Sequence, residues 1–196
     1  MIIWPGLAAA AGAIPSTPVR DTFTDTNGTL LPTHDSRWTA TLNNCDIQSN
    51  ACAGTVAADS NWCSWNEATY GPDCESYCTI TVNPGTGWMT INARQTTTAS
   101  ATADGYQGGV DFNVATDVIE IYELLDGAGT LLNSVAFEIN ANDVLTFRAV
   151  GSALKLYVNG VLQLETADAT YGAAGYIAIL VGDTNVRLDT FGGGTL

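Results

Sequence analysis

The chain has 196 residues, which is enough for one well-buried core and is typical of an all-β sandwich that forms a single domain. Its formal net charge is -14, with six Lys and Arg residues against 20 Asp and Glu. Such a chain has no basic surface to neutralise phosphates, so we expect no nucleic acid partner and no adhesion to anionic membranes. No apolar run reaches the roughly 20 residues that a membrane-spanning helix needs.

The first 13 residues are apolar, and several of them are large. The segment has no positive region ahead of its apolar stretch and is shorter than an ordinary signal peptide, although residues 11–13 resemble a cleavage site. Export through this segment stays open as an alternative. We expect residues 1–19 to form an N-terminal extended arm and linker that anchors the protein on neighbouring subunits of an assembled particle. The anchoring side chains are Ile2, Ile3, Trp4 and Leu7.

The predicted folded domain spans residues 20–196 and opens with two strands. Residues 21–24 and 37–42 have the composition of short strands, and residues 25–28 form a turn after the first of them. Trp38, in the second strand, is expected in the core. Few helices are expected, because charged residues make up only 13% of the chain.

The next segment, residues 43–78, contains all five cysteines. Its Asn, Ser, Gly and Asp content predicts a loop insertion that is held by cross-links and not by burial. The spacing lacks the paired C-x-x-C signature of structural zinc, so we favour disulfides over reduced thiols or a metal. An odd count leaves one sulfur free or bonded to another chain. The disulfide candidates are Cys45, Cys52, Cys63, Cys74 and Cys78.

From residue 79 onward, the sequence predicts a succession of strands separated by turns about every ten residues, which is typical of a sandwich or barrel. Asn159-Gly160 supplies the two positive φ values that a type I′ turn needs, so we expect a hairpin there. Asp-Thr-Phe occurs at both 21–23 and 189–191, and this repeat is either chance or a sign that the first and last strands lie side by side. The predicted strands are 79–82, 88–93, 109–114, 118–124, 131–139, 144–150, 154–158, 161–165, 176–181 and 186–191.

These segments resemble a known group of domains. Residues 153–162, 167–168, 175–179 and 188–191 are similar to the C-terminal half of concanavalin A-like lectin and glucanase domains, including laminin G-like modules. Residues 21–30 with Trp38 resemble the start of such domains in bacteriophage and environmental bacterial proteins. The resemblance covers roughly residues 20–193 apart from the Cys-rich segment. It implies an antiparallel two-sheet jelly-roll sandwich that binds ligands on a concave face or on loops at its rim.

The resemblance also raises the question of catalysis. In laminarinase-type glucanases, one strand holds Glu-x-Asp-x-x-Glu, and a retaining enzyme needs two carboxylates about 5 to 5.5 Å apart. The best candidate stretch is 117–123, but period-two alternation puts Glu120 on the opposite face from Asp117 and Glu123. Asp111 shares a face with Asn113, whose amide is no general acid. The sequence therefore predicts no catalytic residues, and a glucanase is the weaker alternative.

Calcium is the cofactor that the resemblance implies. Related glucanases and laminin G-like domains often hold a structural or ligand-bridging Ca2+, and Asp189 matches the last-strand aspartate that supplies one ligand. Asp21 and Asp25 would lie nearby if the terminal strands pair. The alternative is that these residues form turns. His34, the only histidine, is expected to be a turn residue beside Asp35.

A sugar site needs an aromatic platform flanked by polar groups that satisfy hydroxyls. Four aromatic residues crowd into the Cys-rich segment among Asn, Glu and Asp residues. A small core beneath the disulfides, or a contact with a neighbouring subunit, would explain this cluster equally well. The candidate glycan-binding residues are Trp62, Trp65, Tyr70 and Tyr77.

Together these patterns predict a non-enzymatic, lectin-like surface-display protein with possible binding of host or environmental glycans. We expect a bacteriophage virion component, such as a capsid decoration or fibre, that lies on the virion surface and contacts neighbouring subunits through its arm. The alternative is a secreted, extracellular carbohydrate-binding adhesion module, and a glucanase-type glycoside hydrolase is the second alternative.

Overall fold

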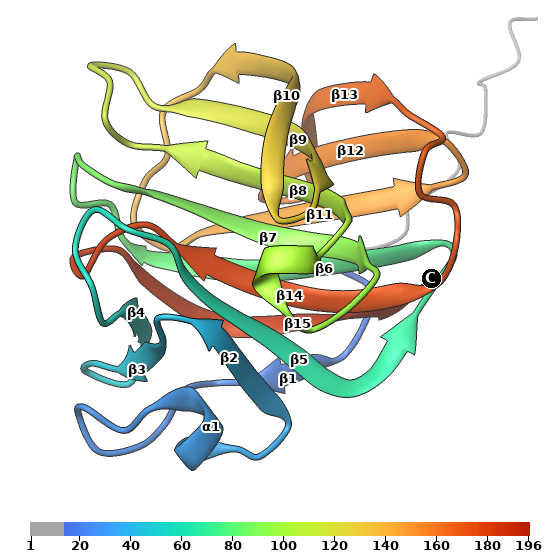
Figure 1. The fold of residues 1–196 in the computed structure, drawn as a ribbon. Coiled ribbons are helices and arrows are strands. Elements are labelled where there is room, and N and C mark those ends of the chain that lie inside the picture. The colour runs from blue at the N-terminus through green and yellow to red at the C-terminus, as the bar shows by residue number, and fades with distance from the viewer. Residues whose placement is uncertain (1–13) are drawn as a thin grey trace, which may run out of the picture.

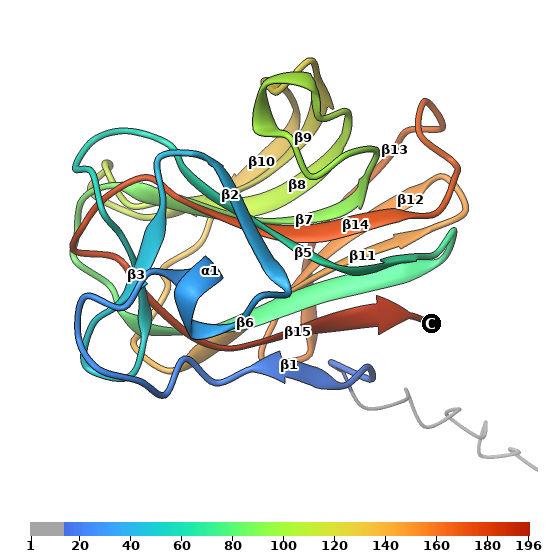
Figure 2. The same cartoon turned by 60° about the horizontal axis from the view of Figure 1, so that its bottom comes forward.

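The structure, a computed structural model, describes residues 14–196 as two antiparallel β-sheets stacked face to face (Figures 1 and 2). The all-β, two-sheet sandwich predicted from the sequence is therefore confirmed. Within these residues the helical elements are α1 (Leu31–His34) and η1 (Ser100–Thr102). No helix in this part of the chain is long and apolar enough to cross a membrane.

Seven strands form the sheet that faces the viewer in Figure 1, which we call sheet B. In spatial order they are β10 (Ala128–Ala136), β9 (Val118–Leu125), β8 (Gly105–Asp111), β7 (Trp88–Gln95), β14 (Gly175–Val181), β5 (Asn61–Tyr70) and β2 (Trp38–Leu42).

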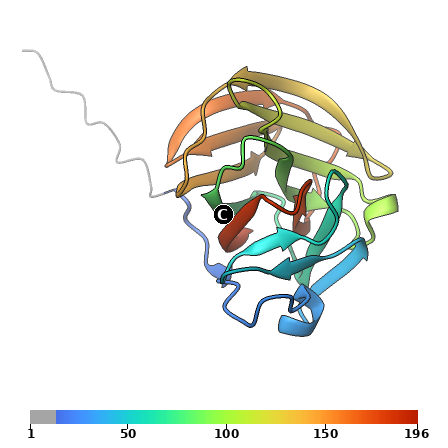
Figure 3. The same ribbon diagram turned by 90° about the vertical axis from the view of Figure 1, so that its left-hand side faces the viewer.

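Eight strands form the second sheet, sheet A, which lies behind sheet B, and Figure 3 shows the two layers from one end. Its main path is β13 (Val161–Ala167), β12 (Ala153–Val158), β11 (Asp143–Val150), β6 (Cys74–Val82), β15 (Arg187–Thr195), β4 (Cys52–Gly54) and β3 (Cys45–Ile47). Strand β1 (Val19–Asp21) pairs with β15 off this path.

The first and last strands lie side by side, which is one of the two explanations for the repeated Asp-Thr-Phe (Figure 2). Asp21 pairs with Phe191 across β1 and β15. Phe23 and Phe191 both pack against Trp38, with ring centroids 6.0 and 5.0 Å from it, and all three side chains are buried. The two ends of the domain therefore close one part of the core together.

The core between the sheets follows the two-residue alternation of the strands. In β7, Met89 and Ile91 are fully buried between the sheets, and in β9 Ile119 and Ile121 are their equivalents. The predicted hairpin between β12 and β13 is confirmed, because both of its turn residues have positive φ: 50° at Asn159 and 77° at Gly160.

The prediction that residues 43–78 form a loop insertion is wrong. This segment forms β3, β4 and the ten-residue strand β5, and it supplies the first half of β6, which lies between β11 and β15. Its cysteines occupy buried strand positions that aliphatic side chains usually fill, which hides the apolar pattern. In contrast to the predicted disulfides, the structure contains all five as free, buried thiols: Cys45, Cys52, Cys63, Cys74 and Cys78.

The predicted anchor residues Ile2, Ile3, Trp4 and Leu7 lie outside the described residues, which begin at Ile14. The linker that follows is fastened to the domain. The backbone N–H groups of Ser16 and Thr17 donate to the Glu75 carboxylate at 2.6 and 2.7 Å, and the Tyr77 hydroxyl donates to the Thr17 carbonyl at 3.0 Å.

Candidate functional site

One row of residues crosses the outer face of sheet B, the face turned away from sheet A. Strand pairing places five residues side by side across β5, β14, β7, β8 and β9. Because side chains alternate between the two faces of a strand, these five share one face while their sequence neighbours fill the core. The row consists of Trp62, Leu180, Thr90, Gly109 and Glu120.

A hollow of about 300 Å³ opens on this face above β7, β8 and β9, and we call it the first hollow. Position 109, between Thr90 and Glu120 in the row, is a glycine, and a Cβ there would lie 2.2 Å from the Met89 carbonyl oxygen and could not be accommodated. Trp88 and Tyr122 supply aromatic walls. The polar lining residues are Thr90, Gln107, Asp111, Asn113 and Glu120.

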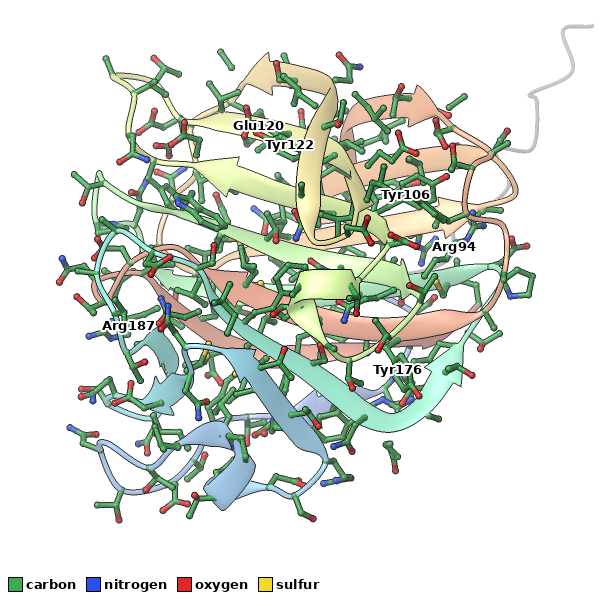
Figure 4. All side chains as sticks on the ribbon, viewed as in Figure 1. Arg94, Tyr106, Glu120, Tyr122, Tyr176 and Arg187 are labelled. Atoms are coloured by element: carbon green, nitrogen blue, oxygen red, sulfur yellow. The ribbon has the colours of Figure 1, made fainter. Side chains whose placement is uncertain are left out.

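Two carboxylates line this hollow from neighbouring strands. Asp111 pairs with Val118, two residues before Glu120, so the two acids are diagonal neighbours on one face, with Cβ atoms about 7 Å apart. The Tyr122 hydroxyl donates to Glu120 at 2.7 Å, and the two side chains extend from the same strand (Figure 4). Asp111 accepts hydrogen bonds from the backbone N–H and the side-chain amide of Asn113 at 2.9 and 2.8 Å.

The surroundings of Glu120 change the pKa of its carboxyl. Burial raises the pKa of Glu120, the hydrogen bond from Tyr122 opposes that rise, and the negative charge of Asp111 adds to it. The net pKa of Glu120 lies above its ordinary value. Glu120 therefore keeps a proton to higher pH than an exposed glutamate does.

A second hollow of about 250 Å³ adjoins the first and shares Trp88, Gln107 and Gly129 with it. Trp62 and Leu180 line it, and residues of the segment around η1, including Ala101, form its opposite wall. The hydrogen bond from the Ser100 N–H to Thr41 Oγ1, 2.8 Å long, ties this segment to β2. We call the two adjoining hollows the groove.

Trp88 forms the wall that both hollows share. Its indole lies against Gly182, where a Cβ would be only 2.3 Å from the ring. Glycine at position 182 therefore allows the large ring to lie flat against the neighbouring backbone. Gln107 also lines both hollows. Its side-chain amide makes no hydrogen bond within residues 14–196, so it is free to bind a ligand.

Of the four aromatic residues predicted to bind glycans, the structure places only Trp62 in the groove. Trp65 is fully buried in the core and packs edge-on against Trp38 at 5.1 Å. Tyr70 is buried beneath the Arg20 guanidinium, 4.9 Å from its ring centroid. Tyr77 is buried against the linker and donates its hydroxyl to it. None of these three residues lines the groove.

The three predicted calcium ligands are engaged by protein donors. Asp21 accepts hydrogen bonds from Phe23 N and Trp38 Nε1, both 2.7 Å long, and lies 3.1 Å from His34 Nε2. Asp25 lies 3.0 Å from His34 Nδ1, and Asp189 accepts from its neighbour's N–H. Residues 14–196 contain no group of three or more His, Cys, Asp or Glu side chains that could hold a metal ion. These aspartates therefore do not fit a calcium site.

Sequence reasoning missed Trp88, Tyr122 and the pairing of Asp111 with Glu120. The carboxylates come from different strands, so a search along one strand cannot find them, and the β8–β9 register is needed. A signal for Trp88 was present: Trp88, Thr90 and Asn92 alternate with the apolar Met89, Ile91 and Ala93, which marks an outward face with an exposed ring.

Known structures share this two-sheet jelly-roll fold. A carbohydrate-binding module, CBM66, from Bacillus subtilis matches with a TM-score of 0.67 at 19% identity, covering 81% of this chain and 95% of that one. The exoplasmic/lumenal domain of VIP36 in its Ca2+/Man3GlcNAc-bound form matches at 0.60 and 11%, covering 82% and 84%. A Bacillus licheniformis beta-glucanase matches at 0.58 and 14%, covering 90% and 96%.

No protein-family model and no curated protein sequence matches the chain. At these identities the structural matches establish the fold alone: the chain has the concanavalin A-like jelly-roll fold, as the sequence resemblance implied.

Proposed function

We propose that the protein is a non-enzymatic, lectin-like module that binds glycans in the groove of sheet B. The observation behind this proposal is the lining of the groove, where Trp88 and Tyr122 offer aromatic rings beside the polar groups of Gln107 and Glu120. A sugar presents apolar C–H faces and a rim of hydroxyls, and this combination of groups matches both. The shared fold of a carbohydrate-binding module and of a VIP36 domain bound to mannose supports the proposal.

Each groove residue has a distinct part in the proposed contact. The Trp88 ring stacks on one sugar ring, because it is only partly buried and forms the common wall. The Gln107 amide both donates to and accepts from hydroxyls, and the carboxylates of Glu120 and Asp111 accept hydroxyl hydrogens.

A glycan array tests this proposal with the wild type and Trp88→Ala. We expect Trp88→Ala to weaken binding by at least about tenfold, because it removes the stacking surface. Tyr157→Ala is the matched control, since Tyr157 is a partly buried aromatic residue on the outer face of sheet A. Equal binding by the wild type and Trp88→Ala would show that the glycan site lies outside the groove.

The carboxylate pair supports glycoside hydrolysis as a second candidate function. Glu120, with its raised pKa, has the property of a general acid, and Asp111 lies beside it on the same face. Release of reducing sugar from a β-glucan by the wild type, abolished in Glu120→Gln, would establish it. Binding without any release of reducing sugar would leave the lectin-like function.

The location of the protein, on a virion or secreted, is also part of the proposal. Display on a bacteriophage virion through the apolar arm, or secretion, remains the expectation drawn from residues 1–19. Because Ser16 and Thr17 bind Glu75, removal of residues 1–13 is a cleaner test than removal of the whole arm. We expect the truncated protein to fold but to lose incorporation into the particle, and normal incorporation would contradict anchoring.

A further inference from the structure

The groove has two features that restrict its ligand, its length and its charge. We propose that it binds an uncharged oligosaccharide of at least two sugar units that spans both hollows, an inference that rests on the proposed function. Glycans that bear carboxylate or sulfate groups should not bind there.

All the charged side chains that line the groove are acidic. Asp111 and Glu120 line the first hollow, and Asp126 lines the second. Among the described residues, those that line the groove include no Lys, Arg or His. An anionic sugar would therefore face carboxylates without a compensating cation, and such like-charge contacts are strongly unfavourable.

Every lysine and arginine of the sequence is engaged elsewhere in the fold. Lys155 pairs with Glu165 on sheet A, and Arg148 donates to the buried Glu75 at 2.7 Å. The arginines with other partners are Arg20, Arg37, Arg94 and Arg187. Since the chain has six Lys and Arg in all, no lysine or arginine is left to reach an anion in the groove.

The length of the groove argues for more than one sugar unit. The hollows measure about 300 and 250 Å³ and share the walls formed by Trp88, Gln107 and Gly129. Ligand sites usually measure about 300 to 1,000 Å³ and bury most of the ligand surface. Each hollow alone is at or below the lower limit of that range, whereas the two together lie well within it.

Trp62 marks the second hollow as a place for a polar ligand. Its side chain lines the hollow and is 2% exposed, and its Nε1–H has no acceptor among the described residues. A buried donor without an acceptor is unfavourable, and most such donors in folded proteins are satisfied. A hydroxyl or ring oxygen of a second sugar unit that reaches this buried N–H would supply the missing acceptor.

The test uses neutral gluco-, manno-, galacto-, xylo- and fructo-oligosaccharides of one to six units, with matched series that end in a uronate or a sulfate. We expect binding to rise by about tenfold from one to two units, and the charged series to bind at least about tenfold more weakly than their neutral counterparts. Trp62→Phe, which removes the N–H, and Ala101→Trp, which fills the second hollow from an exposed wall position, should each abolish the gain from the second unit.

The outcomes separate this inference from the function on which it rests. Charged glycans that bind as well as neutral ones, single sugars that bind as well as longer ones, or an unchanged two-unit gain in both variants would overturn the inference. If Trp88→Ala still abolishes binding in that case, the groove remains a glycan site. Absence of binding to every series would overturn both. Thermal unfolding checks that both variants are folded. Ala101→Trp also tests the second hollow without altering a buried residue.

Discussion

Glu75 shows how single residues hold distant parts of this chain together. Its side chain is fully buried and accepts hydrogen bonds from Ser16, Thr17 and Arg148. Burial raises the pKa of this carboxyl, but the hydrogen bonds from these three residues outweigh burial, and the net pKa lies below the ordinary value of 4.5. A buried carboxylate with this many donors is expected to stay ionised at neutral pH.

We predict that Glu75→Gln lowers the free energy of unfolding at pH 7 by about 2 to 4 kcal/mol, because Arg148 and the linker N–H groups lose their charged acceptor. A carboxyl with a lowered folded-state pKa stabilises the fold above its unfolded pKa, and this contribution is lost as the pH falls through the folded pKa. Wild-type stability should therefore fall below about pH 4.5, and the variant should lack that part of the fall. Chemical denaturation across pH 3 to 7 measures both, and parallel pH profiles would contradict this role.

At the scale of strands, the sequence predicted elements well where alternation was clear. The strands of the second half and the Asn159-Gly160 hairpin follow from local pattern and turn chemistry. The strands of segment 43–78 could not be predicted in this way, because Cys63 and Cys74 lie in buried strand positions while their polar neighbours resemble a loop. The groove could not be predicted either, since Asp111 and Glu120 meet only through the pairing of β8 with β9.

The contact between β14 and β7 provides a prediction about the groove. Gly182→Ala should displace the Trp88 ring, because the new Cβ would lie well inside contact distance of the indole. We expect glycan binding on the array to weaken by about tenfold or more, with a smaller loss of stability. Gly172→Ala is the control for a glycine substitution in an exposed loop that does not line the groove, with nothing within 4 Å of the added Cβ. Unchanged binding by Gly182→Ala would mean that the position of the Trp88 ring does not affect glycan binding.

The strands of the Cys-rich segment provide another prediction. Burial raises the pKa of all five thiols, and that of Cys74 rises to about 11. We therefore expect no thiol to react with a disulfide reagent in the native protein at pH 8, because buried thiols form little thiolate. All five should react after unfolding in guanidinium without reductant. Fewer than five reactive thiols in the unfolded protein would show that a disulfide forms in this segment.

At the scale of the whole molecule, the sandwich uses its faces differently. The inner faces are filled by one large core, and the segment around η1 covers a small apolar cluster with Trp62 and Leu180 on the outside of sheet B. The groove lies beside this cover and is bounded by it. Pairing of β1 with β15 joins the two ends of the domain beside the large core.

The most direct measurement of the central claim is the NMR spectrum of the tryptophan indole N–H groups during a titration. Addition of the neutral two- to six-unit oligosaccharides should shift the signals of Trp62 and Trp88, which line the groove. Trp38 and Trp65, which are buried between the sheets, serve as internal references and should not move. Unchanged signals for Trp62 and Trp88 at saturating oligosaccharide would contradict glycan binding in the groove.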